Sequence, residues 1–234
     1  MKALFVVPSP EGGVYEFREI PVPTPEPGQV LVAVRAAGTN RGELLARPLL
    51  RSDNPAATPM RAGIEFAGEI VALGAGVSGW KPGDRIMARE TGGYAEYAVA
   101  HQRALMRVPE GMAWAEAAAI PNVFVTAHDA IVSNAAVKPG ESVLVTAGSS
   151  GVGTAIQIAR YLGARPVLAT TRAATKVTYC ARSGHTKSSI LVRQAGPKPL
   201  SRRQASAVST RSSTRSVDRC SPTTSACSRS RGGS

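Results

Sequence analysis

The chain has 234 residues, of which 43% are hydrophobic and 5% aromatic, and it carries a formal net charge of +12. This length fits one large domain or two small ones. The chain contains no run of about 18 apolar residues that could span a membrane, and its N-terminus lacks the charged-then-apolar order of a signal peptide. Its three cysteines, Cys180, Cys220 and Cys227, cannot form a disulfide framework. We therefore expect a cytoplasmic protein rather than a membrane or secreted one.

The positive charge is concentrated in the last quarter of the chain. Residues 1–178 hold 17 Lys and Arg against 15 Asp and Glu, whereas residues 179–234 hold 11 against one. Half of this second segment is Ser, Thr and Arg, and Tyr179 is its only aromatic residue. Because such a composition buries too little apolar surface to offset the conformational entropy lost on folding, residues 179–234 are predicted to form a disordered basic tail.

The first 120 residues are predicted to form a β-rich domain. Short β-prone segments are separated by Gly- and Pro-containing turns, which is typical of a small barrel. The Pro-rich stretch 21–28 is expected to be extended and turn-forming, because proline fixes φ and donates no hydrogen bond. The predicted strands are residues 2–7, 17–20, 29–37, 65–73, 85–88 and 94–100.

A different pattern begins at Trp114. Two helical segments, 115–119 and 123–132, come before an apolar strand. That strand, the helix after it and a second buried strand make a βαβ unit, which begins a parallel sheet. The fold class is therefore α/β, with a partial doubly wound domain over residues 121–178. Its predicted elements are a strand at 142–147, a helix at 154–162 and a strand at 166–170.

The turn between the first strand and its helix is rich in glycine and reads Ala147-Gly148-Ser149-Ser150-Gly151-Val152-Gly153. Glycine lets the backbone approach phosphate groups closely, and a helix N-terminus supplies free N–H groups and the positive end of a dipole. This turn is therefore predicted to bind the pyrophosphate of a dinucleotide, and a purely structural turn is the alternative. The predicted contacts are Gly148, Ser149, Gly151, Val152 and Gly153.

The end of the second strand distinguishes between the two nicotinamide dinucleotides. An acidic residue there would bind the ribose 2′-OH of NAD, but this chain has Thr170, Thr171 and Arg172, with Lys176 four residues further on. Hydroxyl groups and cations suit a 2′-phosphate, so NADPH is favoured over NADH. Thr171, Arg172 and Lys176 are the predicted contacts. The alternative is that Arg172 and Lys176 are solvated surface charges.

Five motifs in a fixed order resemble the medium-chain dehydrogenase/reductase superfamily, and within it the zinc-free, zeta-crystallin-like quinone oxidoreductase branch. The resemblance covers residues 1–178. It implies a GroES-like catalytic domain followed by a Rossmann domain, with the nicotinamide in the cleft between them and homodimers common among the relatives. The motifs are Ala36-Ala37-Gly38-Thr39-Asn40, Gly63-Ile64-Glu65-Phe66-Ala67-Gly68-Glu69, Gly83-Asp84-Arg85, Gly92-Gly93-Tyr94-Ala95-Glu96-Tyr97 and the glycine-rich turn 147–153.

The residues themselves argue against a metal site. Zinc-dependent relatives carry Gly-His-Glu where this chain has Gly63-Ile64-Glu65, and isoleucine cannot bind a metal. No cysteine occurs before Cys180, so the body of the chain offers no thiolate ligand. His101 and His128 have no partners at the spacing that metal ligands require. We therefore expect no metal.

The resemblance implies a reaction and roles for two more residues. The enzyme would transfer hydride from NADPH to a quinone or a related α,β-unsaturated carbonyl, relying on positioning and hydrogen bonding instead of a metal. Asn40 would be the catalytic residue on the substrate side of the nicotinamide, and Thr126 would contact the nicotinamide ring. The alternative interpretation is a turn-forming Asn40 and an ordinary helical Thr126.

The resemblance ends near Thr178, and we interpret residues 179–234 as a frameshifted segment. A shift of one base turns the codons of Ser, Arg and Thr into those of apolar and mixed residues. In that frame, residues 180–190 permit Leu-Arg-Ser-Leu-Gly-Ala-His-Glu-Val-Val-Asp, which is similar to the next helix and strand of the family. A truncated reductase with little turnover is therefore expected.

Two further hypotheses stay open. The chain could be a non-catalytic, reductase-like scaffold whose basic tail binds nucleic acid non-specifically, with a steep dependence on salt. No specific nucleic-acid partner is expected, because the tail lacks interleaved aromatic residues for base stacking. The chain could also be a non-functional frameshift product. No charge pattern in residues 46–60 identifies the substrate.

Overall fold

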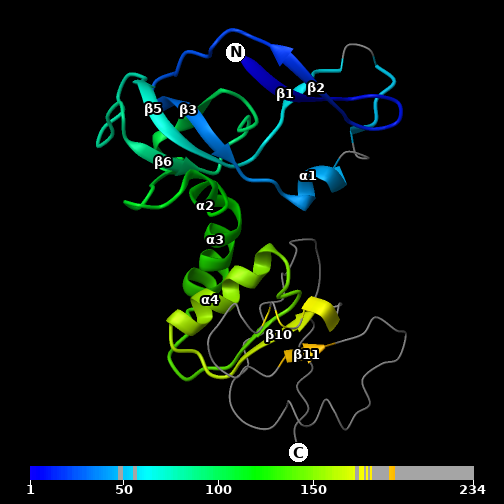
Figure 1. Ribbon diagram of the computed structural model, residues 1–234, viewed down its shortest axis with the longest axis vertical. Helices are drawn as coiled ribbons and strands as arrows, with labels where there is room; N and C mark the ends of the chain where they lie inside the picture. The colour runs from blue at the N-terminus through cyan, green and yellow to red at the C-terminus, as the bar shows by residue number, and fades with distance from the viewer. Residues whose placement is uncertain are drawn as a thin grey trace, which may run out of the picture.

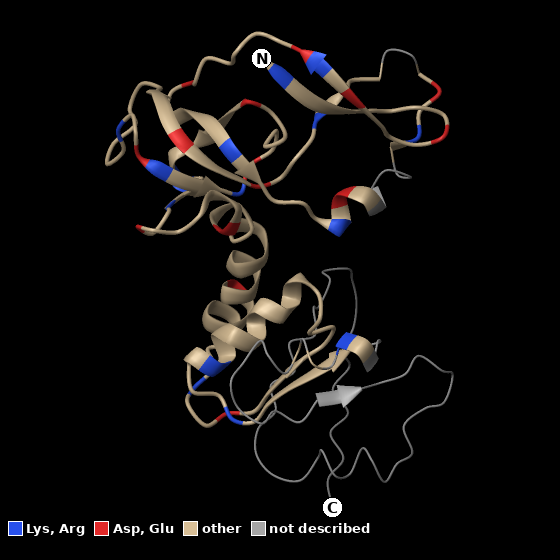
Figure 2. Cartoon of the chain, in the orientation of Figure 1, with Lys and Arg blue, Asp and Glu red and all other residues tan. Residues whose placement is uncertain are grey.

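The computed structural model describes residues 1–46, 50–54, 57–171, 174–176, 178, 180 and 190–192. A β-rich part at the N-terminus and a smaller α/β part are joined by helices α2 (Trp114–Ala118) and α3 (Pro121–His128) (Figure 1). Charges of both signs are interspersed over the β-rich part (Figure 2), consistent with the near neutrality of residues 1–178. No helix within the described ranges is long and apolar enough to cross a membrane.

The β-rich part is built on a five-stranded antiparallel sheet with the order β7-β3-β5-β6-β8. Alternate residues of the central strands point into one core, where Val30, Val32, Phe66, Ile70 and Ile86 are at most 1% exposed. The burial of one face explains the alternating pattern of these segments. The strands are β3 (Gln29–Ala37), β5 (Phe66–Leu73), β6 (Arg85–Ala88), β7 (Tyr97–His101) and β8 (Leu105–Arg107).

A second antiparallel sheet has the order β2-β1-β4 and lies beside the first. A bridge between Ala3 and Ala95 and a hydrogen bond from the Leu4 amide to the Tyr94 carbonyl (2.9 Å) connect the two sheets. Helix α1 (Arg41–Ala46) follows directly after β3. The strands of this sheet are β1 (Lys2–Val7), β2 (Val14–Glu19) and β4 (Met60–Arg61).

The α/β part contains the predicted βαβ unit. Strands β9 (Val143–Val145) and β10 (Val167–Thr171) are parallel neighbours, and α4 (Thr154–Tyr161) connects them. Helix α3 packs beside α4 and continues into a π-helical segment, Asp129–Asn134. The α/β fold class is therefore confirmed, with a β-rich part first and a parallel sheet after it.

The structure differs from the sequence-based expectations in several places, and helix α1 and strands β4 and β8 were not predicted. Strand β2 begins three residues earlier than predicted, and β7 covers Tyr97–His101 instead of residues 94–100. A further strand, β11 (Ile190–Val192), lies within the predicted tail and pairs in parallel with β10, and it was not predicted. Its three residues are apolar and β-prone, although the composition around them is polar. Apart from β11 and Cys180, the predicted tail lies outside the described residues, and so does the segment on which the frameshift hypothesis depends.

Candidate functional site

A cleft of about 450 Å³ lies where the two parts of the chain meet. Its walls come from the loop after β3, the end of α2, the start of α3 and the glycine-rich turn. Asn40 and Gly151, which are 111 positions apart in the sequence, both line it. The predicted substrate-side residue and the predicted phosphate-binding turn therefore face the same cavity. The polar side chains of this cleft are Thr39, Asn40, Arg41 and Glu65.

Asn40 is held by hydrogen bonds from both sides of its amide. Its Nδ2 donates to Glu65 Oε1 at 2.7 Å, and its Oδ1 accepts from Asn122 Nδ2 at 2.9 Å. The backbone N–H of Asn40 donates to Glu43 Oε2 at 3.0 Å, which fixes the first turn of α1. A side chain held in this way enters a reaction already oriented, so little rotamer entropy is lost when a ligand binds.

Tyr94 supports the same loop from the β-rich part. Its hydroxyl lies 3.0 Å from the Gly38 carbonyl oxygen and 2.9 Å from Glu43 Oε2. Burial, followed by the hydrogen bond to Glu43 and the negative charge of that carboxylate, raises the pKa of Tyr94 above its ordinary value near 10. The phenol therefore stays protonated and acts as a donor in the neutral pH range.

The glycine-rich turn has a backbone that only glycine allows. A Cβ on Gly153 would lie 2.3 Å from the Gly148 carbonyl oxygen, and a Cβ on Gly151 would lie 2.6 Å from Val123 Cγ1. Ala147 adopts the left-handed conformation with φ of 58°, which is uncommon for a residue with a side chain and is found mainly at functional turns. Hydrogen bonds within the described part of the chain use the amides of Gly148, Ser150 and Gly153.

Among the described residues, the backbone amides of Ser149, Gly151 and Val152 donate no hydrogen bond. These three N–H groups lie just before the first turn of α4, at the positive end of its dipole. Free donors, close backbone approach and a helix N-terminus are what a pyrophosphate needs. The turn therefore fits the phosphates of a dinucleotide.

The remaining predicted cofactor residues are placed differently from one another. Thr171 is 2% exposed, and its hydroxyl lies 3.0 Å from that of Ser149, so it holds the glycine-rich turn from its buried side. Lys176 is exposed in a short helical turn after β10. Arg172 lies outside the described residues. Thr126 is exposed, and its hydroxyl donates to the Asn122 carbonyl one turn earlier on α3.

The sequence analysis did not propose three side chains that line the cleft or hold its residues in place, namely Glu65, Asn122 and Tyr94. Glu65 belongs to the motif that begins Gly63-Ile64-Glu65, but the motif does not show that the Glu65 side chain is buried. Asn122 follows Pro121, a proline that predicts a helix start, and this would have placed its amide near a helix N-terminus. No pattern in the sequence showed that Asn122 would meet Asn40, because 82 positions separate them.

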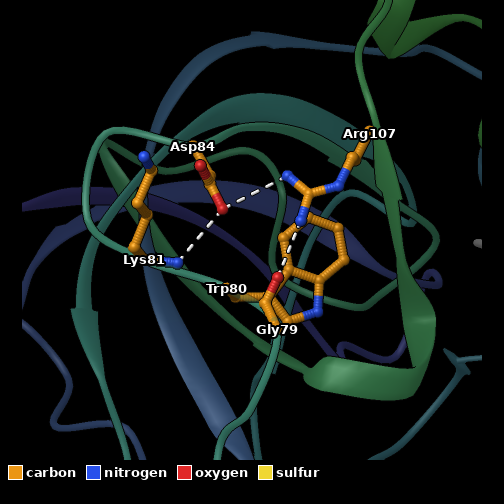
Figure 3. Close-up of a pocket in the computed structure, with 5 residues that line it drawn as sticks. All are labelled: Gly79, Trp80, Lys81, Asp84 and Arg107. Atoms are coloured by element: carbon orange, nitrogen blue, oxygen red, sulfur yellow. Dashed lines mark hydrogen bonds and ion pairs between the residues drawn. The ribbon is translucent and has the colours of Figure 1, made fainter.

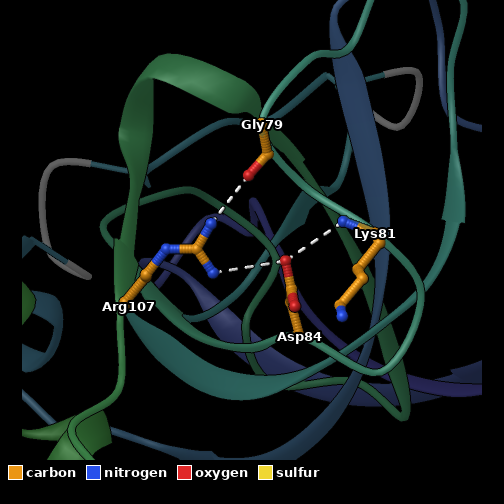
Figure 4. A network of polar contacts seen from close by, with 4 residues as sticks. All are labelled: Gly79, Lys81, Asp84 and Arg107. Atoms are coloured by element: carbon orange, nitrogen blue, oxygen red, sulfur yellow. Dashed lines mark hydrogen bonds and ion pairs between the residues drawn. The ribbon is translucent and has the colours of Figure 1, made fainter.

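A second hollow, of about 410 Å³, lies away from this cleft, between the turn before β6 and strand β8 (Figure 3). Arg107 stacks on the Trp80 ring at 4.4 Å and donates to Asp84 Oδ2 and the Gly79 carbonyl. Asp84 also accepts from the Lys81 amide, so the polar groups of this network satisfy one another (Figure 4). The network fastens the turn to the sheet and presents no convergent set of groups to a ligand.

Comparisons with known proteins agree with this architecture. Residues 26–110 match the alcohol dehydrogenase GroES-like domain. The human quinone oxidoreductase is 43% identical over 148 residues, which cover 62% of this chain and 45% of that protein. The chain thus spans about half the length of that relative.

Solved structures show the same similarity. A mycobacterial quinone oxidoreductase superposes with a TM-score of 0.71 at 29% identity, covering 85% of this chain and 60% of that one. The CurK enoyl reductase superposes with a TM-score of 0.72 at 28% identity, covering 83% and 60%. The GroES-like match and these neighbours support the predicted family. The chain is similar to members of the medium-chain dehydrogenase/reductase superfamily, and within it to the quinone oxidoreductase-like branch.

Proposed function

We propose that this chain acts as a zinc-independent, NADPH-dependent oxidoreductase on a quinone or a related α,β-unsaturated carbonyl. The observation that carries the proposal is the shared cleft, in which Asn40 faces the glycine-rich turn at Gly151. The substrate class is supported by the names of the relatives, among them the human quinone oxidoreductase and an enoyl reductase. When bound, NADPH would supply the hydride for the reduction.

The cofactor is assigned to two regions of the α/β part. The free amides of Ser149, Gly151 and Val152 would donate to the pyrophosphate, with Gly148 and Gly153 allowing its close approach. Lys176 would pair with the 2′-phosphate, and Thr171 would hold Ser149 in place. The choice of NADPH is further supported by a mycobacterial neighbour solved in complex with NADPH, with a TM-score of 0.71 and 29% identity.

Zinc independence is supported by the donor set of the cleft. Zinc in proteins takes nitrogen, sulfur or carboxylate ligands, usually three or four of them from the chain. Of the cleft's side chains, Glu65 is the one with such a group, and both of its oxygens already accept N–H donors. Across the described part of the chain, no three His, Cys, Asp or Glu residues gather as a possible ligand set.

Asn40 is the residue proposed to touch the substrate side. One N–H of its Nδ2 is used by Glu65, and the other, which has no partner among the described residues, would donate to a carbonyl oxygen in the cleft. A donor placed where negative charge develops on an oxygen lowers the barrier to reduction. The remainder of the contribution would come from alignment of the bound groups in the cleft.

The assignment of Lys176 provides the first test. In the variant Lys176→Ala, loss of one charge-assisted hydrogen bond should weaken NADPH binding about tenfold and leave NADH binding unchanged. Lys138→Ala is the matched control. Lys138 is also exposed, but it lies before the start of β9, whereas Lys176 lies after the end of its parallel neighbour β10. Dissociation constants would be measured by nicotinamide fluorescence at about 0.15 M salt, where binding of phosphates to distant basic residues is screened.

Equal losses of affinity for both dinucleotides, or an equal loss in the control, would contradict the assignment of Lys176. Failure of the unaltered chain to bind either dinucleotide would contradict the proposal as a whole. Quinone-dependent oxidation of NADPH by the same preparation tests the reaction separately from binding, and with it the expectation of little turnover. The scaffold hypothesis depends on tail residues outside the described ones.

A further inference from the structure

Glu65 is a buried carboxylate to which the proposed function assigns no role. It is 2% exposed and lies directly before β5, where the cleft meets the core of the β-rich part. A buried carboxylate is costly unless hydrogen bonds satisfy it. Glu65 has two such bonds, and each comes from a different wall of the cleft.

The first bond fixes the orientation of Asn40. An ionised carboxylate can only accept hydrogen bonds, so the group that faces Glu65 Oε1 at 2.7 Å must be the NH₂ of Asn40. The Asn40 Oδ1 then faces Asn122 Nδ2 at 2.9 Å. Glu65 therefore fixes the orientation of the Asn40 amide. The group that Asn40 offers to a ligand is then its second N–H and not its carbonyl oxygen.

The second bond completes the start of α3. The residue before this helix is Ile120, whose side chain cannot cap it. Glu65 Oε2 accepts the Asn122 backbone N–H at 2.8 Å, so a residue from the β-rich part supplies the missing cap. Its negative charge also suits the positive end of the helix dipole.

Helix α3 in turn contacts the glycine-rich turn. A Cβ on Gly151 would overlap Val123 Cγ1, and the Thr154 hydroxyl lies 3.2 Å from the Val123 carbonyl oxygen. Val123 directly follows Asn122, which Glu65 caps. A continuous series of contacts thus runs from Asn40 through Glu65 and the start of α3 to Gly151.

We propose that Glu65 is a positioning residue that orients the Asn40 amide as a donor and holds it in register with the glycine-rich turn. This inference rests on the proposed function for the identity of what binds in the cleft, but the positioning itself does not depend on turnover. Gly38 makes it possible, because a Cβ there would lie 2.4 Å from Glu65 Oε1. A larger residue at position 38 would push the carboxylate away from Asn40.

The variant Glu65→Gln tests the proposal with almost no change in volume. Both oxygens of Glu65 face N–H donors, so either orientation of glutamine sets its NH₂ against one of them. The matched control is Glu69→Gln, which removes the same charge from within β5, close by in the sequence, but affects only an exposed ion pair with Arg35. We expect kcat to fall about tenfold to a hundredfold in Glu65→Gln, with KM for NADPH nearly unchanged.

A merely structural role of Glu65 would also lower activity, so a second readout is needed. If Glu65 acts through Asn40, then Glu65→Gln should have almost no further effect on kcat in an Asn40→Ala background. Fully additive losses would overturn the proposal. A kcat in Glu65→Gln equal to that of Glu69→Gln would overturn it as well.

Nuclear magnetic resonance separates this inference from the proposed reaction. The side-chain amide signals of Asn40, identified by their loss in Asn40→Asp, should shift in Glu65→Gln and not in Glu69→Gln. In the unaltered protein these amide protons should exchange with water about tenfold more slowly than those of the exposed Gln157. Unshifted signals overturn the proposal even in an active enzyme, and if Glu65→Gln fails to fold, fast exchange in the unaltered protein overturns it.

Discussion

The two parts of this chain are packed with different kinds of side chains. In the β-rich part the innermost residues are large, with Phe66, Ile70 and Ile86 almost fully buried. In the α/β part the equivalent cluster is dominated by small residues. Five of its nine buried members are alanine, namely Ala127, Ala155, Ala159, Ala164 and Ala169.

This difference follows from what each part must bring together. Facing sheet surfaces of a barrel-like domain lie far enough apart to need bulky side chains between them. The glycine-rich turn needs α4 close to its sheet, and a Cβ on Gly148 would lie 2.8 Å from the Ala169 Cβ. Both parts bury apolar side chains, but the second uses small ones where helix, turn and sheet must lie close together.

The largest expected effect is loss of a large side chain from the β-rich core. Phe66→Ala should lower the free energy of unfolding by about 3–5 kcal/mol, because the site is fully enclosed and cannot collapse around the cavity. Phe17→Ala is the control, since Phe17 is 76% exposed on β2. Urea denaturation followed by tryptophan fluorescence gives both values. Similar losses in the two variants would contradict the assigned core.

The α/β part should respond to the opposite change. Ala159→Val adds two methyl groups at a fully buried position of α4 and should cost about 1–3 kcal/mol through overpacking. Tyr161→Val on the same helix is the control, because Tyr161 is 91% exposed. Thermal unfolding would be compared for the two variants. A tolerated valine at 159 would show that the helix does not lie as close to the sheet as described.

The smallest effect concerns the loop that carries Asn40. The pKa of Tyr94 is raised in the folded chain, so the folded state is stabilised while the phenol is protonated. This contribution is complete below about pH 10 and is lost progressively as the pH rises further. Tyr94→Phe should lower stability at neutral pH by about 0.5–1.5 kcal/mol, through loss of the hydroxyl hydrogen that the Gly38 carbonyl and the Glu43 carboxylate share.

The same variant should also lose part of the alkaline destabilisation. Free energies of unfolding would be measured near about pH 8 and about pH 11 for both proteins. An unchanged difference between the two pH values in Tyr94→Phe would show that other groups cause the alkaline loss.

Much of the local structure was predictable because local patterns decide it. The bounds of β1, β3 and β6 were predicted correctly from β-prone composition, alternation and flanking turns, and the glycine run placed the turn before α4 correctly. The strand β11 was missed, because a polar composition over many residues concealed three apolar ones. Composition averages over a segment, whereas a parallel strand needs only a short apolar run beside an available edge.

The sequence by itself determined the family resemblance, the α/β class and the candidacy of Asn40 and the glycine-rich turn, because these depend on residue types at short spacings. Only the tertiary structure decided that Glu65, Asn40 and Asn122 form one network, and that Thr171 holds the glycine-rich turn from its buried side. The physical reason is that burial and hydrogen-bond partners arise from chain segments far apart in sequence. A carboxylate in a motif can hold two segments together only when N–H donors from both of them reach its oxygens.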